Sequence, residues 1–126
     1  MGESRVVAVV GASTNRSKFG NRAVRAYRAE GWRVYPVHLT AREIEGIPAC
    51  RSILDVPEKV HRATIYLPPE RVLDVLPEIA RKDVDEMYLN PGAESRAVVE
   101  RAAALGITTI LECSIVEIGR SPQNPD

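Results

Sequence analysis

Apolar residues along this chain follow two alternating spacings. One is the short, nearly continuous apolar run, and the other is the three- and four-residue return of an amphipathic helix. Gly31 and Gly106 stand where two of the helical patterns end, as glycine commonly does after a helix. The runs that predict buried strands are Val6–Val10 and residues 33–38, 63–67, 86–89 and 107–111. Strands of this kind, alternating with helices, are typical of a parallel sheet covered on both faces.

We therefore expect one doubly wound α/β domain over residues 1–120, Rossmann-like and built on a five-stranded parallel sheet, with residues 121–126 as a flexible tail. Right-handed crossovers make 3-2-1-4-5 the simplest strand order, which puts the strand at 63–67 on the edge beside 33–38. Ligands bind such sheets outside the carboxyl ends of the strands, at the switch point beside the first strand. The segments expected there are residues 11–20, 36–38, 67–69, 90–93 and 112–114.

The composition of the chain limits the classes of partner that we expect for this domain. The formal net charge of the 126 residues is +0, so we expect no general polyanion-binding surface and no nucleic-acid partner. We find no apolar run long enough to span a membrane and no signal-peptide core, which favours a cytoplasmic protein without membrane association. Cys50 and Cys113 lack metal-ligand spacing and are expected to be reduced thiols. A homodimer is one option for so small a domain.

The loop at residues 11–20 carries the strongest chemical signal. It joins the first strand to the first helix, and the N–H groups and dipole of a helix start favour an anion. Ser13 adds a hydroxyl, Lys18 a mobile ammonium, and Gly20 lacks the Cβ that would keep a phosphate from the backbone. The cations in and just after the loop are Arg16, Lys18, Arg22 and Arg25. We expect a phosphorylated ligand here, whereas Arg22, Arg25 and Arg28 recur every three residues and predict an exposed face.

Two common nucleotide motifs fit this loop poorly. Gly11 matches the first glycine of the dinucleotide fingerprint, but Ser13 and Arg16 occupy the other two glycine positions. Residues 35–38 read Tyr-Pro-Val-His and provide no acid to hold the ribose of NAD. Arg16 also replaces the second glycine of a P-loop. Coenzyme A, with its ribose 3′-phosphate, and NADP, with its 2′-phosphate, both remain compatible with a basic loop.

Short blocks found in order along residues 5–119 make the picture more specific. They are Val10-Gly11-Ala12-Ser13, Lys18-Phe19-Gly20-Asn21, Val34-Tyr35-Pro36-Val37, Glu43-Ile44-Glu45-Gly46, Leu67-Pro68-Pro69, Asn90-Pro91-Gly92-Ala93-Glu94-Ser95 and Cys113-Ser114-Ile115-Val116-Glu117. Through this set the chain resembles the small single-domain CoA-binding proteins, a family related to the CoA-binding domain of the succinyl-CoA synthetase α subunit. His38 departs from the usual asparagine, and Asn90 from the common glutamine.

The resemblance implies a site for coenzyme A or an acyl-CoA at the carboxyl ends of the strands. The residues that it puts around the phosphates are Gly11, Ala12, Ser13, Lys18 and Gly20. Those that it puts beside the adenosine are Pro36, Val37 and His38. Those that it puts on the far side, or at the start of the pantetheine arm, are Leu67, Pro68 and Pro69.

Catalytic groups are not evident beside these binding residues. The sequence offers no Ser–His–Asp arrangement, paired acids or metal cluster, and the synthetase relatives use a phosphorylated histidine on a second domain that this chain ends before reaching. We therefore expect a ligand-binding protein rather than an enzyme. Two alternatives stay open: an NADP-binding oxidoreductase, and a redox protein in which Cys113 forms a mixed disulfide with CoA.

Overall fold

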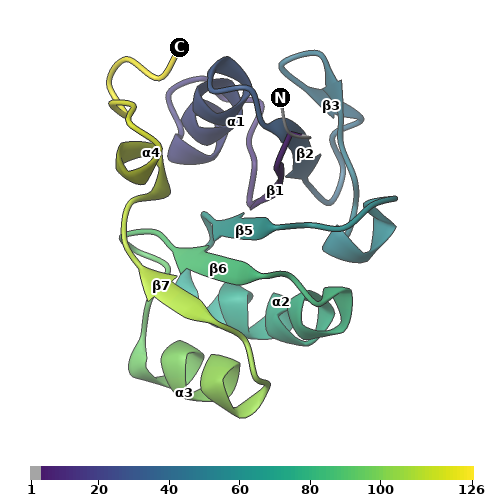
Figure 1. The fold of residues 1–126 in the computed structure, drawn as a ribbon, viewed down its shortest axis with the longest axis vertical. Helices are drawn as coiled ribbons and strands as arrows, with labels where there is room; N and C mark the ends of the chain where they lie inside the picture. Colours follow the sequence, from purple (N-terminus) through teal and green to yellow (C-terminus); the bar gives the residue numbers. More distant parts are fainter. Residues whose placement is uncertain (1–3) are drawn as a thin grey trace.

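Five short strands form the parallel sheet that the apolar runs predict (Figure 1). The computed structural model describes residues 4–126. The strands are β1 (Val6–Val10), β2 (Arg33–Val37), β5 (Arg62–Ile65), β6 (Glu86–Leu89) and β7 (Thr109–Leu111), and every neighbouring pair is parallel. The predicted α/β class is confirmed. In residues 4–126, no helix is long and apolar enough to span a membrane.

Two helices cover each face of the sheet (Figure 1). On one face lie α1 (Phe19–Ala29) and the single turn α4 (Ser114–Glu117). On the other lie α2 (Pro69–Lys82) and α3 (Arg96–Ala104). Val7 and Val9 of β1 pack toward α1, whereas Val6, Ala8 and Val10 pack toward α2. Because β1 is buried on both faces, all five of its residues are apolar.

The order of the strands differs from the expected 3-2-1-4-5. The sheet runs β2-β1-β5-β6-β7, which is 2-1-3-4-5 when its strands are counted along the chain. The strand predicted at 63–67 is therefore not at the edge, because β5 pairs with β1 in the centre. Cys50 lies at the free edge of β2 and forms a single bridge with it. The N–H of Cys50 donates to the carbonyl of Pro36, and its carbonyl accepts from the N–H of His38, both at 2.8 Å.

The segment between β2 and β5 accounts for this difference. It folds into a hairpin of β3 (Glu43–Ile44) and β4 (Ile47–Pro48), passes alongside β2 at Cys50, and then forms the 3₁₀ turn η1 (Ile53–Asp55). One bridge is enough to occupy the edge, so the chain crosses back over β1 before the next full strand begins. The pattern of single residues does not reveal such a short pairing.

The backbone segments that follow the carboxyl ends of β1 and β5 approach each other closely at the switch point. Gly11 has φ +90°, and a Cβ there would lie 2.5 Å from the carbonyl oxygen of Tyr66. A Cβ on Gly20, in the first turn of α1, would lie 2.2 Å from the carbonyl oxygen of Gly11. Real side chains do not tolerate such distances, so glycine is required at both positions. This close packing sets the shape of the crevice above the sheet.

Residues 121–126, predicted as a flexible tail, lie against α1. Asp126 is 3.0 Å from the guanidinium of Arg25, and the carbonyl of Pro122 accepts from Arg22. Arg25 is only 9% exposed, which corrects the expectation of an exposed face at that position. Its Nε donates to Asn21 and its Nη2 to the carbonyl of Arg16, so it ties the loop at residues 11–20 to α1.

Candidate functional site

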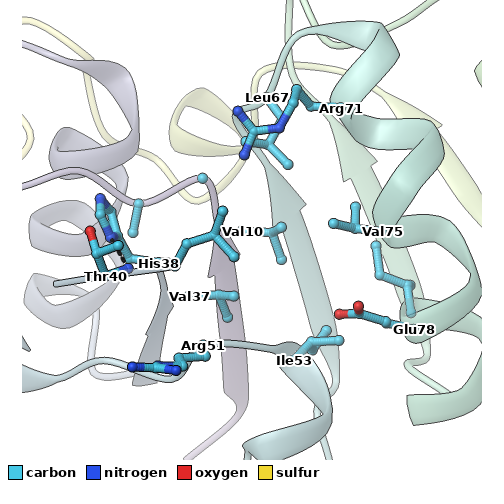
Figure 2. A pocket seen from close by; sticks show the side chains of 14 residues that line it. Val10, Val37, His38, Thr40, Arg51, Ile53, Leu67, Arg71, Val75 and Glu78 are labelled. Atoms are coloured by element: carbon cyan, nitrogen blue, oxygen red, sulfur yellow. Dashed lines mark hydrogen bonds between the residues drawn. The ribbon is translucent and has the colours of Figure 1, made fainter. Parts of the chain in front are cut away.

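Two adjoining cavities lie at the carboxyl ends of the strands. The first, of about 430 Å³, lies between the ends of β1 and β2 and the helix α2 (Figure 2). The second, of about 480 Å³, lies between the start of α1 and the segments that follow β5 and β6. Gly11 and Leu67 line both cavities. The two cavities therefore adjoin each other at the switch point, where the fold class predicts a ligand site.

Most of the residues expected at the site line one cavity or both. The first cavity is lined by Gly11, Ala12, Val37, His38 and Leu67. The second is lined by Gly11, Ser13, Lys18, Gly20, Leu67 and Pro68. Pro36 and Pro69 line neither. Pro36 is buried within β2 opposite Val9, and Pro69 begins α2.

The start of α1 is left without a protein cap. Lys18 is the N-cap residue, no side chain accepts from the first turn, and that turn holds no acid. The preceding loop instead satisfies its own groups: Ser13 Oγ accepts from the N–H of Asn15, and Asn15 Oδ1 accepts from the N–H and hydroxyl of Ser17. An uncapped helix start keeps N–H donors and the positive end of the helix dipole available to an anion.

Lys18 differs from the other cations around this loop. Arg16 donates to Glu45 at 2.7 Å, Arg22 to the carbonyl of Pro122, and Arg25 to Asn21. The exposed ammonium of Lys18 has no hydrogen-bond or ion-pair partner among residues 4–126. It is the loop cation that a phosphate could recruit without breaking an existing contact.

Gly20 has a structural role that the sequence interpretation did not include. We expected its missing Cβ to let a phosphate approach the backbone, and Gly20 does line the second cavity. The space a Cβ would need is, however, already occupied by the carbonyl of Gly11. A larger residue at position 20 would displace α1 from β1, so such a variant tests folding rather than phosphate contact.

His38 lines the first cavity and is held by the turn that follows β2. Its Nδ1 accepts from the N–H groups of Thr40 and Ala41, at 3.1 and 2.9 Å. A neutral imidazole that accepts at Nδ1 carries its proton on Nε2. The turn after β2 therefore fixes the tautomer, and the departure from asparagine preserves a donor at this position.

The first cavity also contains residues that the sequence analysis missed. Arg51 follows the Cys50 bridge, Arg71 lies in the first turn of α2, and Thr40 follows His38 (Figure 2). The only acid among the described lining residues is Glu78, which accepts from the hydroxyl of Ser52 at 2.7 Å. Arg51 lies between β4 and η1, and Arg71 lies in α2; neither stands in the sequence blocks that indicated the site.

Asn90 is buried and fully engaged within the fold. Its Nδ2 donates to Thr64 Oγ1 at 2.7 Å and to the carbonyl of Ile65 at 3.0 Å, and its Oδ1 accepts from the N–H of Ser114 at 2.9 Å. It thus ties the ends of β5 and β6 to α4. The helix α3 begins shortly after this segment, at Arg96, because Ser95 caps it by accepting from the N–H of Val98.

Tyr66 and Cys113 lie on the α1 side of the sheet. Burial raises the pKa of the Tyr66 phenol well above its usual value, and its oxygen is 3.3 Å from Ser114 Oγ. Tyr66 lines the second cavity, whereas Cys113 lines neither cavity. Within residues 4–126, no group of three or more His, Cys, Asp or Glu side chains is arranged to hold a metal ion.

Known proteins resemble this chain in both sequence and fold. It is 35% identical over 114 residues to the ADP-forming acetate–CoA ligase I of Archaeoglobus fulgidus, a match covering 90% of this chain and 16% of that ligase. A conserved hypothetical protein of Pyrococcus furiosus superposes with a TM-score of 0.81 at 29% identity, covering 91% of this chain and 99% of the other. The acetyl-coenzyme A synthetase 1 of Candidatus Korarchaeum cryptofilum, in complex with phosphate and ADP, gives 0.75 at 31% identity, covering 85% and 25%.

These likenesses identify the family of this domain. The chain spans about a sixth of the length of the Archaeoglobus ligase, so the likeness concerns one domain of that protein. Residues 5–119, nearly the whole chain, match the family described as the CoA binding domain. The chain therefore belongs to the CoA-binding domain family, akin to the CoA-binding part of the succinyl-CoA synthetase α subunit.

Proposed function

We propose that this protein binds coenzyme A or an acyl-CoA across the two adjoining cavities. The observation that carries the proposal is that the cavities share Gly11 and Leu67 beside the uncapped start of α1. Such a site suits a molecule with a central diphosphate and an arm on each side. In this arrangement the diphosphate lies over Ser13 and Lys18, with the helix dipole and the ammonium opposing its charge.

The adenosine arm then occupies the first cavity. Val37 and His38 form one wall and Leu67 the other, and the His38 Nε2–H is available to a ribose or adenine acceptor. Pro36 acts indirectly, through the strand that carries Val37, and Pro69 through the start of α2. Family membership and the names of the ligase relatives support the same ligand.

The pantetheine arm occupies the second cavity. Its lining is rich in apolar surface, and it includes Phe19, Tyr66, Pro68, Pro91 and Ala93. A slender chain suits such a surface better than a nicotinamide, whose carboxamide needs paired donors and acceptors. For this reason we favour coenzyme A over NADP. We do not extend the ligase activity of the longer relatives to this domain.

The test is thermal unfolding with CoA, dephospho-CoA, NADP, NAD and ATP. A ligand present at 100 times its Kd adds about 2.7 kcal/mol to the free energy of unfolding, which raises Tm by several degrees. We expect CoA to give the largest rise. A rise with NADP alone would favour the oxidoreductase, and no rise with any of the five would overturn the proposal.

The mixed-disulfide alternative has its own test. Because Cys113 is half-buried and lines neither cavity, we expect no CoA adduct on it. Intact mass measured after diamide treatment with CoA would detect the adduct, and Cys113→Ser is the control for its position. An adduct that the Cys113→Ser variant loses would restore the redox hypothesis.

A further inference from the structure

The tip of the β3–β4 hairpin contacts α1 and the loop before it through one acidic residue. The carboxylate of Glu45 accepts from Arg16 Nη1 at 2.7 Å and from Asn21 Nδ2 at 3.0 Å. The backbone carbonyl of Glu45 accepts from Arg28 Nη1, also at 2.7 Å. Because the Glu45 side chain is only 12% exposed, these contacts are largely shielded from solvent, which strengthens hydrogen bonds to a charged group.

The backbone at the hairpin tip is unusual for the residue that stands there. Ile44 pairs with Ile47, and the two residues between them both have positive φ, +53° at Glu45 and +78° at Gly46. A two-residue turn of this form favours asparagine, aspartate or glycine at its first position. Glu45 occupies that position in spite of the conformational cost, which indicates that its side chain has a use beyond the turn itself.

Asn21 extends the contact from the hairpin into the loop. It is fully buried, and its Nδ2 donates both to Glu45 Oε2 and to the backbone carbonyl of Ser13, each at 3.0 Å. Arg16 and Asn21 both approach Glu45 as donors, one at each carboxylate oxygen. A glutamine would offer a single oxygen and would turn its NH2 group toward the second donor. The arrangement therefore requires a carboxylate.

The part of the loop that these contacts hold lies at the second cavity. Ser13 and Lys18 line that cavity, and Arg16 lies between them in the chain. Glu45 itself lines neither cavity. A loop that is ordered before a ligand arrives loses less conformational entropy on binding, which raises the affinity without adding a contact.

We propose that Glu45 is a positioning residue of the candidate site, which holds residues 13–18 in their binding geometry through Arg16 and Asn21. This inference rests on the proposed function and deepens it, because it assigns part of the affinity to a residue that does not touch the ligand. The alternative role of Glu45 is that of a counter-ion of Arg16, whose removal would free a cation and strengthen the binding of an anion. The two roles predict changes of opposite sign.

Hydrogen exchange of the free protein, followed by NMR, tests the positioning directly. The amides to follow are those of Asn15, Ser17 and Lys18, whose N–H groups are all hydrogen-bonded within the loop. In Glu45→Gln they should exchange about tenfold faster, the scale of losing one hydrogen bond to a charged group. Glu43→Gln is the matched control, because Glu43 is an exposed acid of the same hairpin without a side-chain partner among residues 4–126. Unchanged exchange in Glu45→Gln would overturn the proposal.

Calorimetric titration with CoA tests the effect on binding. Relative to Glu43→Gln, which removes the same charge, Glu45→Gln should weaken CoA binding about tenfold. It should also weaken binding when position 16 is already alanine, because the contact between Glu45 and Asn21 does not involve Arg16. Tighter binding by Glu45→Gln, or an effect that disappears in the Arg16→Ala background, would make Glu45 a counter-ion and overturn the positioning role.

A second variant separates positioning from stability. Glu45→Asn places the Asn-Gly pair that this turn prefers, but its side chain is shorter and has only one acceptor oxygen. We expect the Tm of the free variant to stay close to that of the wild type while its CoA affinity falls as in Glu45→Gln. A lowered Tm with unchanged CoA affinity would give Glu45 a role in folding alone and contradict the proposal.

The binding results distinguish this inference from the proposed function. Equal CoA affinities of the wild type and Glu45→Gln would overturn the positioning role and leave CoA binding standing. A wild-type protein that binds no CoA would overturn the proposed function and, with it, the role of Glu45 in binding.

Discussion

The charged side chains at the two ends of the same sheet differ in whether they form ion pairs. At the amino ends of the strands, Arg33 begins β2, Arg62 begins β5 and Glu86 begins β6, and each of these side chains is in an ion pair. At the carboxyl ends, the Lys and Arg side chains that line the cavities have no acidic partner among residues 4–126; they are Lys18, Arg51 and Arg71. Charges at one end satisfy the fold, and those at the other are available to a ligand.

Arg62 illustrates the first kind. Its side chain is only 3% exposed, it lies 2.6 Å from both Glu86 and Glu117, and its guanidinium stacks over the ring of Tyr88 at 4.2 Å. Because Glu117 belongs to α4, Arg62 fastens that short helix to the sheet. A buried cation surrounded by two carboxylates and an aromatic ring has a structural role. Removing it leaves the two carboxylates without their countercharge, which destabilises the fold.

The cavity cations illustrate the second kind. Their positive charges gather on one surface without neutralisation, which adds nothing to the stability of the free protein. The comparison teaches that the two ends differ in the pairing of their charges and not in the presence of arginine, since arginine stands at both ends.

The largest effect should come from Arg62→Met. It leaves two carboxylates without their shared cation, so we expect the free energy of unfolding to fall by about 3 kcal/mol and Tm by about 10 °C. Arg5→Met is the matched control, because Arg5 contacts the same Glu86 and the same Trp32 ring but is 53% exposed. It should cost less than about 1 kcal/mol. Chemical denaturation measures both losses of unfolding free energy. Equal losses for the two variants would contradict the structural role of Arg62.

Lys18→Ala should produce the intermediate effect, and on binding rather than on folding. We expect CoA affinity to weaken by about 1–3 kcal/mol, the scale of a charge-assisted hydrogen bond, and Tm without ligand to stay unchanged. Arg16→Ala removes the same charge from the same loop, but Arg16 is already paired with Glu45. Calorimetric titration should therefore find a smaller loss for it. Comparable losses would assign the effect to overall loop charge.

The smallest effect should be a pH dependence at the amino end. Hydrogen bonds from Arg33 and then Tyr35 hold the pKa of the Glu58 carboxyl below its usual value. A carboxyl whose folded pKa is depressed contributes stability above its unfolded pKa, about 4.3, and loses it as pH falls through the folded pKa. The Tm advantage of the wild type over Glu58→Gln should therefore be small at pH 6 and shrink toward pH 2. An advantage that grows on acidification would contradict this pairing.

Local features of the sequence predicted many of the residues that line the two cavities. The Gly11 turn, the loop before α1 and the second strand, expected over residues 33–38 and found over Arg33–Val37, follow from apolar periodicity and turn chemistry, which act over a few residues. Arg51 and Arg71 could not be predicted in the same way. Their place on the same cavity depends on the Cys50 bridge beside Pro36 and on the packing of α2 over β1, which are contacts between distant segments.

The sequence by itself determined the α/β class and the buried strands, because both are encoded by neighbouring residues. The tertiary structure alone decided the strand order, the packing role of Gly20 and the division of charges into paired and unpaired sets. The physical reason is that burial and pairing are properties of the folded surface. Arg25 and Arg28 are both cations of one helical pattern, and only the packing around α1 buries the first and leaves the second exposed.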